Sequence, residues 1–322
     1  MCFVVVCGGA LPQFSEDRCI KFYIFFASGS QFSVKRMVMV SAILLMHCPD
    51  QKGLVAAVTD FLYRHSGNIL HLDQHVDIQT RTFFMRVEWD LKGFGVDRSN
   101  IAELFQVDIA ERFGMHWHLH FSDDVPRVAL FVSKLSHCLH DVLARWQSGQ
   151  WQVEIPVVIS NHKDMEEVVT RFGLSYYYLP ITKKNKVEQE RRQLELLKDH
   201  QVELVVLARY MQILSADFLA HYPERVINIH HSFLPAFPGA RPYHAAQERG
   251  VKIIGATSHY VTADLDAGPI IEQDVARVNH RDTVDDMVRK GQDLEKVVLA
   301  RAIWYHLNRR VLVYGNRTVV FS

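Results

Sequence analysis

The chain has 322 residues and carries 36 basic and 36 acidic side chains, so its formal net charge at pH 7 is zero. This balance gives no electrostatic reason to expect nucleic acid or an anionic membrane as a partner. Hydrophobic residues make up 48% of the sequence and charged residues 22%, which is typical of a globular protein long enough for two domains. No apolar run has the roughly eighteen residues that a membrane-spanning helix needs.

Cysteine usage favours a reducing cytoplasm. Three of the five cysteines fall before residue 20, and the other two, Cys48 and Cys138, stand far apart. No C-x-x-C spacing is present, so neither a zinc site nor a disulfide framework is predicted. The apolar N-terminus has no preceding basic region, which argues against a secretory signal.

Residues 1–36 mix short apolar runs with glycine, serine and isolated charges, and they show no sustained hydrophobic period. Met37 and Met39 stand directly before the first well-patterned strand. We therefore predict that residues 1–36 are an extension or result from a wrongly assigned start.

Residues 37–122 are predicted to form a β-α-β-β-α-β unit of the ferredoxin-like kind. The first predicted helix ends near Gly67, a candidate C′ glycine, and Ser99 is a candidate N-cap of the second. The predicted strands cover residues 38–47, 69–75, 82–89 and 115–121, and the helices run from residue 54 and over residues 99–113.

The strand, the CPDQKG turn and the helix that opens LVAAV together resemble the ACT domain, a regulatory module that binds amino acids. The resemblance implies a small ligand held near Asp50, Gly53, Leu54 and Asn68, at an interface between two modules. The alternative is that Gly53 is a turn glycine and Asp50 an N-cap residue, and that the module only oligomerises. Either way the resemblance implies a homo-oligomer.

Residues 123–126 are short, acidic and end in proline, which predicts a linker. Beyond it, apolar strands alternate with helices, so residues 127–322 are predicted to form a Rossmann-like, mostly parallel, doubly wound sheet. The α/β pattern places strands at residues 127–132, 156–160, 176–179, 203–208 and 225–229, then at 253–261 and 269–275, a long helix at 282–308 and a hairpin at 311–321.

Asn228 and His230 lie two residues apart at the end of a predicted strand, so their side chains project to one face and that of His231 to the other. Asp266 stands before a Gly-Pro pair, in a rigid turn. A histidine paired with a carboxylate can transfer a proton near neutral pH, and an asparagine amide can stabilise an oxyanion. Each residue alone is more often structural, but together they predict an acyl-transfer or hydrolysis site without a metal.

The pattern N-x-H-x-S-x-L-P, followed by Phe237 and Gly239 and later by D-x-G-P, resembles the folate-dependent formyltransferase family. That family uses the asparagine, histidine and aspartate of these motifs in catalysis. The resemblance also implies that residues 208–215 cradle the folate. The substrate-binding residues it implies are Met211, Gln212, Leu214 and Ser232.

Three features separate the members of this family. Residues 133–140 contain no glycine, unlike the phosphate-binding loop of the glycinamide ribonucleotide transformylases. The chain ends soon after its long helix, so we expect no RNA-binding domain of the methionyl-tRNA formyltransferase kind. The motif residues and the ACT-like module together resemble the formyltetrahydrofolate deformylases, which implies hydrolysis of 10-formyltetrahydrofolate and a role in purine synthesis. Formyl transfer to an amine and a non-catalytic folate or amino-acid sensor stay as alternatives.

A metal is not expected, although the sequence has 18 histidines. The candidates His230, His231, His244 and His259 show no H-x-x-x-H or H-E-x-x-H spacing. The expected partners are thus a folate substrate and an amino-acid effector such as methionine or glycine, with no cofactor, nucleic acid or membrane.

Overall fold

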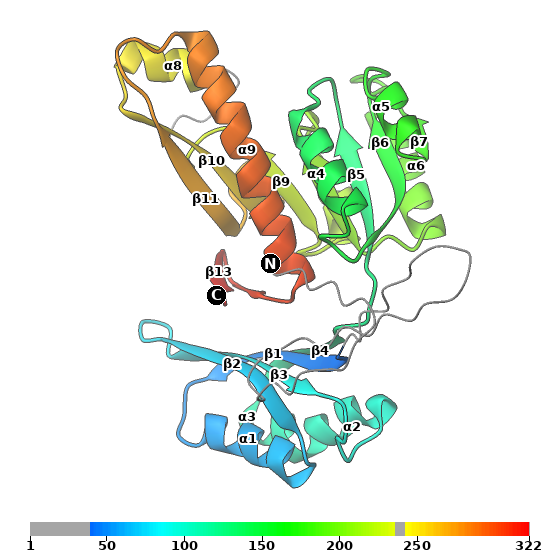
Figure 1. The fold of residues 1–322 in the computed structure, drawn as a ribbon, viewed down its shortest axis with the longest axis vertical. Coiled ribbons are helices and arrows are strands. Elements are labelled where there is room, and N and C mark those ends of the chain that lie inside the picture. The colour runs from blue at the N-terminus through cyan, green and yellow to red at the C-terminus, as the bar shows by residue number, and fades with distance from the viewer. Residues whose placement is uncertain (1–38, 236–241, 322) are drawn as a thin grey trace, which may run out of the picture. The chain divides into compact units, whose positions relative to one another are not determined.

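The chain forms two main sheets and a small C-terminal one, each from strands close to those the sequence predicts (Figure 1). The structure is a computed structural model that describes residues 39–235 and 242–321. The predicted extension at residues 1–36 and the motif residues Phe237 and Gly239 lie outside the described residues.

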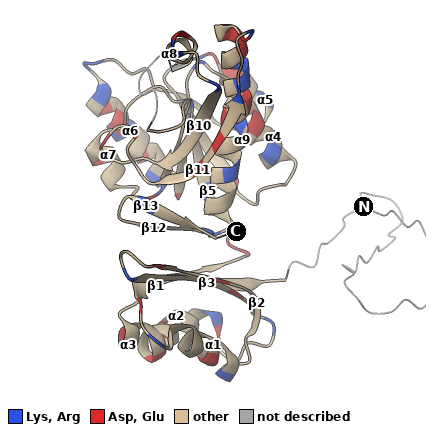
Figure 2. Ribbon diagram, turned by 90° about the vertical axis from the view of Figure 1, so that its left-hand side faces the viewer, with Lys and Arg blue, Asp and Glu red and all other residues tan. Residues whose placement is uncertain are grey.

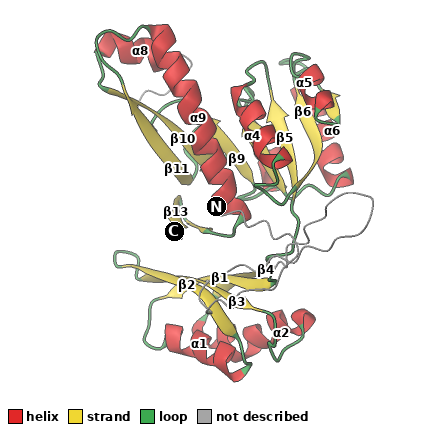
Figure 3. Cartoon of the chain, viewed as in Figure 1, coloured by secondary structure: helices red, strands yellow, loops and turns green. Residues whose placement is uncertain are grey.

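The first sheet is antiparallel with strand order β2-β3-β1-β4, which confirms the ferredoxin-like arrangement. Its strands are β1 Ser41–Pro49, β2 Asn68–Asp77, β3 Thr82–Asp90 and β4 His116–Phe121, and its main helices are α1 Leu54–Arg64, α2 Ile101–Phe105 and α3 Glu111–Phe113. The helices lie on one face of the sheet (Figure 3). Phe61 and Phe105 from the helices pack there with Trp89 from β3. Burying three large aromatic side chains in one cluster stabilises the packing of the helices on this sheet.

Two local predictions in this domain are wrong. Ser99 lies inside a 3₁₀ turn, Arg98–Asn100, and makes no cap hydrogen bond, because the helical turns that follow start at Ile101. The left-handed residue at the end of this helix is Ser66, with φ of +58°, whereas at Gly67 a Cβ atom would lie 3.0 Å from the Leu62 carbonyl oxygen and 3.1 Å from the Phe94 ring. Both errors concern helix ends, where a change of one or two residues leaves the fold intact.

The second sheet has strand order β11-β10-β9-β8-β5-β6-β7. Its five parallel strands are β5 Arg127–Val132, β6 Glu154–Ser160, β7 Tyr176–Tyr178, β8 Leu204–Ala208 and β9 Val226–His230, and its antiparallel strands are β10 Ile253–Tyr260 and β11 Ile270–Arg277. The helices around it are α4 His137–Gln147, α5 Glu166–Arg171, α6 Lys186–Asp199, α7 Ala216–Ala220, α8 Pro242–Arg249 and α9 Val284–Leu307. The predicted mostly parallel sheet is confirmed.

Both faces of this sheet are buried, as the continuous apolar strands predict. Along β5, Leu130 packs into a cluster with α4 and α9, whereas its neighbour Phe131 packs into a second cluster with α6 and α7. From β5 the chain runs outward to β6 and β7 and then returns to β8 and β9 on the other side. The carboxyl ends of β5 and β8 therefore flank a topological switch point, where ligands of such sheets commonly bind.

The C-terminal hairpin, β12 Val311–Tyr314 and β13 Arg317–Val320, contacts both main sheets. Leu312 joins Leu45 and Phe84 of the first sheet in a small apolar cluster, and the hydroxyl of Tyr314 donates to Asp77 at 2.9 Å. The side-chain amide of Asn316 donates to the carbonyl of Ala267, in the loop before β11, at 2.8 Å. The hairpin thus connects the antiparallel sheet to the loop that carries Asp266.

Among the described residues, basic and acidic positions are interspersed along the helices (Figure 2). Among those residues, no helix has the length and apolarity needed to cross a membrane.

Candidate active site

Strand β9 ends in the two residues that the sequence singles out. Asn228 is partly buried, and His230 is 6% exposed at the last position of the strand. The Nδ1 atom of His230 lies 3.3 Å from a carboxylate oxygen of Asp266. The other ring nitrogen, Nε2, is buried and has no hydrogen-bond partner within the part of the chain that the structure describes. Most buried polar atoms in proteins have a partner, so this nitrogen is available to accept a hydrogen bond from a water or a substrate.

Asp266 is held by a turn that only this local sequence allows. Its φ of +53° lies in the left-handed region, which aspartate tolerates better than most residues. A Cβ atom on Gly268 would lie 1.8 Å from the Tyr260 carbonyl oxygen, so no side chain fits there. A hydrogen bond from His230, with the His259 ring close by, holds the pKa of the Asp266 carboxyl well below its usual range. The carboxylate is therefore charged at neutral pH and fixed in place.

His259 completes this cluster. The sequence alone indicates no role for it other than that of a candidate metal ligand. It stands on β10 directly opposite Asn228 in the antiparallel pair. Its Nδ1 donates to the Tyr260 carbonyl, so in the neutral ring Nε2 is free to accept from the Asn228 amide, 3.3 Å away. The same Nε2 lies 3.7 Å from Asp266. His259 therefore orients the amide so that its nitrogen, the donor atom, is defined.

The prediction that His231 points to the opposite face from His230 is wrong. The two ring centroids are only 5.1 Å apart with an interplanar angle of 37°. Strand β9 ends at His230, so the alternation of side chains does not extend to the next residue. His231 is buried beside the site rather than behind the sheet.

The residues predicted to contact folate follow β8. Met211 is 55% exposed, Gln212 is partly buried, and Leu214 is buried in the core below them. Arg209, which precedes them, has a φ of +62°, so the chain turns sharply at the carboxyl end of the strand. Ser232 is buried next to the site, and its carbonyl accepts a hydrogen bond from Thr257. The substrate-binding role of these residues stays a prediction.

The residues predicted to bind an effector lie around the start of α1. Gly53 has φ of +91° and caps the helix without a side-chain bond, while Asp50 is exposed and its backbone N–H donates to the Arg81 carbonyl. The Leu54 side chain is buried in the core, so only its backbone could face a ligand. Asn68 is exposed at the start of β2. The structure thus confirms Gly53 as a turn glycine. The prediction that Asp50 is an N-cap residue is wrong, because Gly53 itself is the N-cap of α1, and ligand binding stays a prediction.

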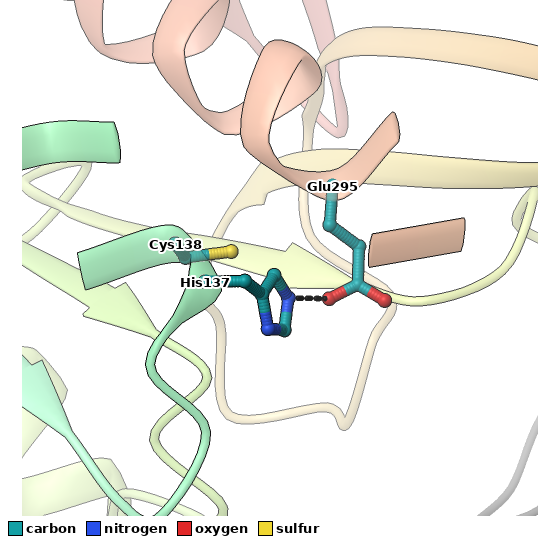
Figure 4. Close-up of side chains that lie close together, drawn as sticks. All are labelled: His137, Cys138 and Glu295. Atoms are coloured by element: carbon teal, nitrogen blue, oxygen red, sulfur yellow. Dashed lines mark hydrogen bonds and ion pairs between the residues drawn. The ribbon is translucent and has the colours of Figure 1, made fainter. Parts of the chain in front are cut away.

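A second buried polar cluster lies at the start of α4, within residues 133–140, the segment in which the sequence predicts no phosphate-binding loop. His137 and Cys138 begin α4, and Glu295 from α9 reaches them (Figure 4). The His137 Nε2 atom lies 2.7 Å from the Glu295 carboxylate. Arg209 Nε lies 3.4 Å from the same carboxylate, and the Tyr243 hydroxyl donates to it at 3.2 Å.

Within the described residues, His137, Cys138 and Glu295 form a group with metal-ligand chemistry, and the predicted histidine set does not. The charge of Arg209 beside Glu295 opposes a cation there. Burial raises the pKa of the Cys138 thiol, so this ligand would be protonated. An ion-paired cluster therefore describes these residues better than a metal site.

The geometry around His230 suits attack of water or an amine on a carbonyl carbon. Asp266 fixes the ring and its tautomer, so the free Nε2 can accept a proton. The Asn228 amide retains one N–H after its contact with His259, and that hydrogen can be donated to an oxygen that becomes anionic.

Comparison with known proteins identifies the family. The formyl transferase family matches residues 126–303, and the ACT domain matches residues 42–102. A formyltetrahydrofolate deformylase from Synechocystis is 57% identical over 89% of this chain and its own full length. One from Bacillus subtilis is 50% identical, over 87% of this chain and 93% of its own. The chain belongs to the formyltetrahydrofolate deformylase family.

Solved structures agree with this assignment. The crystal structure of a formyltetrahydrofolate deformylase from Pseudomonas syringae superposes with a TM-score of 0.87 at 48% identity, covering 89% of this chain and 96% of that one. A glycinamide ribonucleotide transformylase from Symbiobacterium toebii gives a TM-score of 0.59 at 31% identity and covers 64% of this chain and 98% of its own. The deformylase family thus shares more of the chain than the transformylase does.

The Asp266 turn gives a stability prediction. Gly268→Ala should lower Tm at least twice as far as Gly149→Ala, because its Cβ would collide with the Tyr260 carbonyl, whereas Gly149 has positive φ but open space around it. Strain alone at Gly149 is expected to lower stability by about 1 kcal/mol, which is roughly 2–4 °C. Thermal unfolding of the two variants measures the difference, and equal shifts would contradict the steric argument.

Proposed function

We propose that this protein hydrolyses 10-formyltetrahydrofolate to formate and tetrahydrofolate. The observation that carries the proposal is the buried, unpartnered Nε2 of His230, held opposite Asp266 and beside the Asn228 amide. Membership of the deformylase family supports the same substrate and the cleavage of its C–N bond.

Water is the nucleophile in the mechanism we propose. His230, hydrogen-bonded through Nδ1 to Asp266, takes a proton from water at Nε2 while the oxygen attacks the formyl carbon. The Asn228 amide and the protonated ring stabilise the oxyanion of the tetrahedral intermediate. His230 then returns the proton to N10, the C–N bond breaks, and tetrahydrofolate leaves together with formic acid, which ionises to formate and a proton. Atoms and charges balance without a metal or an organic cofactor.

Water is preferred here over an amine acceptor because the positive charge at the carboxyl end of β8 is already paired. The Glu295 carboxylate of α9 lies 3.4 Å from Arg209 Nε and 2.7 Å from His137 Nε2. Little positive charge is left to bind an anionic acceptor such as a nucleotide phosphate. The proposed physiological role follows: a cytoplasmic enzyme that releases formate for purine synthesis and balances the one-carbon pools.

Replacing Asn228 or His230 should strongly reduce the release of formate with water as the sole acceptor. Asn228→Ala should lower kcat by about 100-fold, since removal of one oxyanion donor costs roughly 3 kcal/mol in barrier. His230→Ala should lower it by about 100-fold or more, because the general base is lost. Assays of the formate and tetrahydrofolate that each purified variant produces measure the two losses in kcat.

A matched control is His200→Ala. His200 follows α6 and precedes β8, so it lies at the amino ends of the parallel strands, away from Asn228 and His230. Its ring contacts Tyr177 and should leave kcat within about twofold. Wild-type protein that binds the folate without releasing formate would favour the sensor alternative, and formylated amine as the main product would favour the transferase.

We further propose that an amino acid regulates the enzyme and that chains associate through the antiparallel sheet. Strand β2 is an edge strand that exposes Ile69 and Leu72, which supports pairing with a second copy. The hairpin provides a route to the site, because Tyr314 binds Asp77 at the end of β2 and Asn316 binds the Asp266 loop. A ligand that shifts β2 would thereby act on Asp266.

Regulation predicts a response of formate release to glycine or methionine of about fivefold or more, the usual size of an allosteric coupling. Asn68→Ala, at the proposed effector position, should abolish this response with the basal rate retained, whereas Asp73→Ala on the exposed middle of β2 should not. Tyr314→Phe should weaken the response because the bond to Asp77 is lost. An identical rate of formate release with and without each amino acid would contradict the proposed regulation. Analytical sedimentation would measure whether the chains form an oligomer.

A further inference from the structure

The middle of helix α9 places a carboxylate in the core. Glu295 is 1% exposed, and burial of a charge is expensive unless the charge is paired and hydrogen-bonded. Although burial opposes it, the hydrogen bond from His137 and the charge of Arg209 hold the pKa of Glu295 below its usual value. A carboxylate that stays ionised in the core needs an explanation that packing alone does not supply.

Its partners come from three separate elements that surround the catalytic strand. They are His137 at the start of α4, Arg209 after β8 and Tyr243 in α8. One turn earlier on α9, a Cβ atom on Gly291 would lie 1.9 Å from the Tyr243 hydroxyl oxygen. Helix α9 therefore provides both the space for the Tyr243 hydroxyl, at Gly291, and its hydrogen-bond acceptor, Glu295. Two residues of one helix fit the same hydroxyl, which argues against a chance contact.

The cluster reaches the site through ring contacts. The Tyr243 ring centroid lies 6.1 Å from that of His231, and His231 lies 5.1 Å from His230. Burial, together with the charges of Arg209 and His230, lowers the pKa of His231 to about 4, while Glu295 and Asp266 act in the opposite direction. His231 is therefore uncharged at neutral pH, and the fields of Arg209 and Glu295 act on it with opposite signs.

We propose that Glu295 is a positioning residue for the reaction: its charge cancels that of Arg209, which acts on His231, the neighbour of the His230 ring, and its hydrogen bond with Tyr243 holds that side chain against His231. The inference rests on the proposed function, in which His230 becomes positively charged in the transition state. Without Glu295, the uncompensated guanidinium would disfavour that charge. The groups that act on the pair are Asp266 and His259 from the β10 side, Arg209 after β8, His137 and the neutral Cys138 of α4, Tyr243 of α8 and Glu295 of α9.

The test uses Glu295→Gln in the full-length protein, which keeps the shape and removes the charge. We expect kcat for formate release to fall about tenfold, KM to stay within about twofold, and the acid limb of the pH–rate profile to move down by about one pH unit. Glu295→Gln combined with Arg209→Met should return the acid limb toward the wild-type position. Tyr243→Phe removes a hydrogen bond without changing charge and should leave the limb in place.

Two results would overturn the proposal. One is an unmoved acid limb in Glu295→Gln with only Tm lowered, which would leave the cluster a purely structural role. The other is a double variant that fails to reverse the shift. An NMR titration of the His231 ring separates this inference from the proposed function, because it needs no turnover: its midpoint, near 4 in the wild type, should fall in Glu295→Gln and rise in Arg209→Met. Absent formate release in the wild type would contradict the function alone.

Discussion

The contact between His230 and Asp266 is the constraint on which the rest of the site depends. It occupies one ring nitrogen and so leaves the other, buried and unpartnered, as the only place where a proton can be gained. Holding a carboxylate there requires a left-handed aspartate, a glycine with no room for a side chain and a support for the loop from Asn316. The left-handed aspartate is costly by itself, and the three features together fix one geometry.

Because His230 and Asp266 are largely shielded from solvent, the charges around them matter as much as the contact between them. Three histidines, His230, His231 and His259, lie close together, and the charges near them decide which can be protonated. Asp266 favours a positive ring on one side, and the ion pair of Arg209 with Glu295 keeps the other side neutral. In a buried site such fields act at short range with little screening by solvent. The site is therefore an electrostatic balance among several elements.

The sequence was informative wherever function depends on local spacing. The two-residue period of a strand places Asn228 and His230 together, and the Gly-Pro turn identifies Asp266, so two segments suffice to predict the trio. His259 could not be assigned its role, because that depends on the register between β9 and β10, which the sequence does not reveal. His231 was misplaced because the strand ends one residue earlier than the alternation suggests.

Glu295 shows a different limit. A glutamate in a long amphipathic helix is usually solvent-exposed, and nothing in its neighbours along the chain distinguishes it from the exposed Asp293. Its burial depends on how α9 crosses the sheet and on where α4 and α8 bring His137 and Tyr243, none of which is a local property. Strand periodicity can therefore locate the residues that perform the chemistry, whereas the residues that tune their charge lie on distant helices and emerge only from tertiary structure.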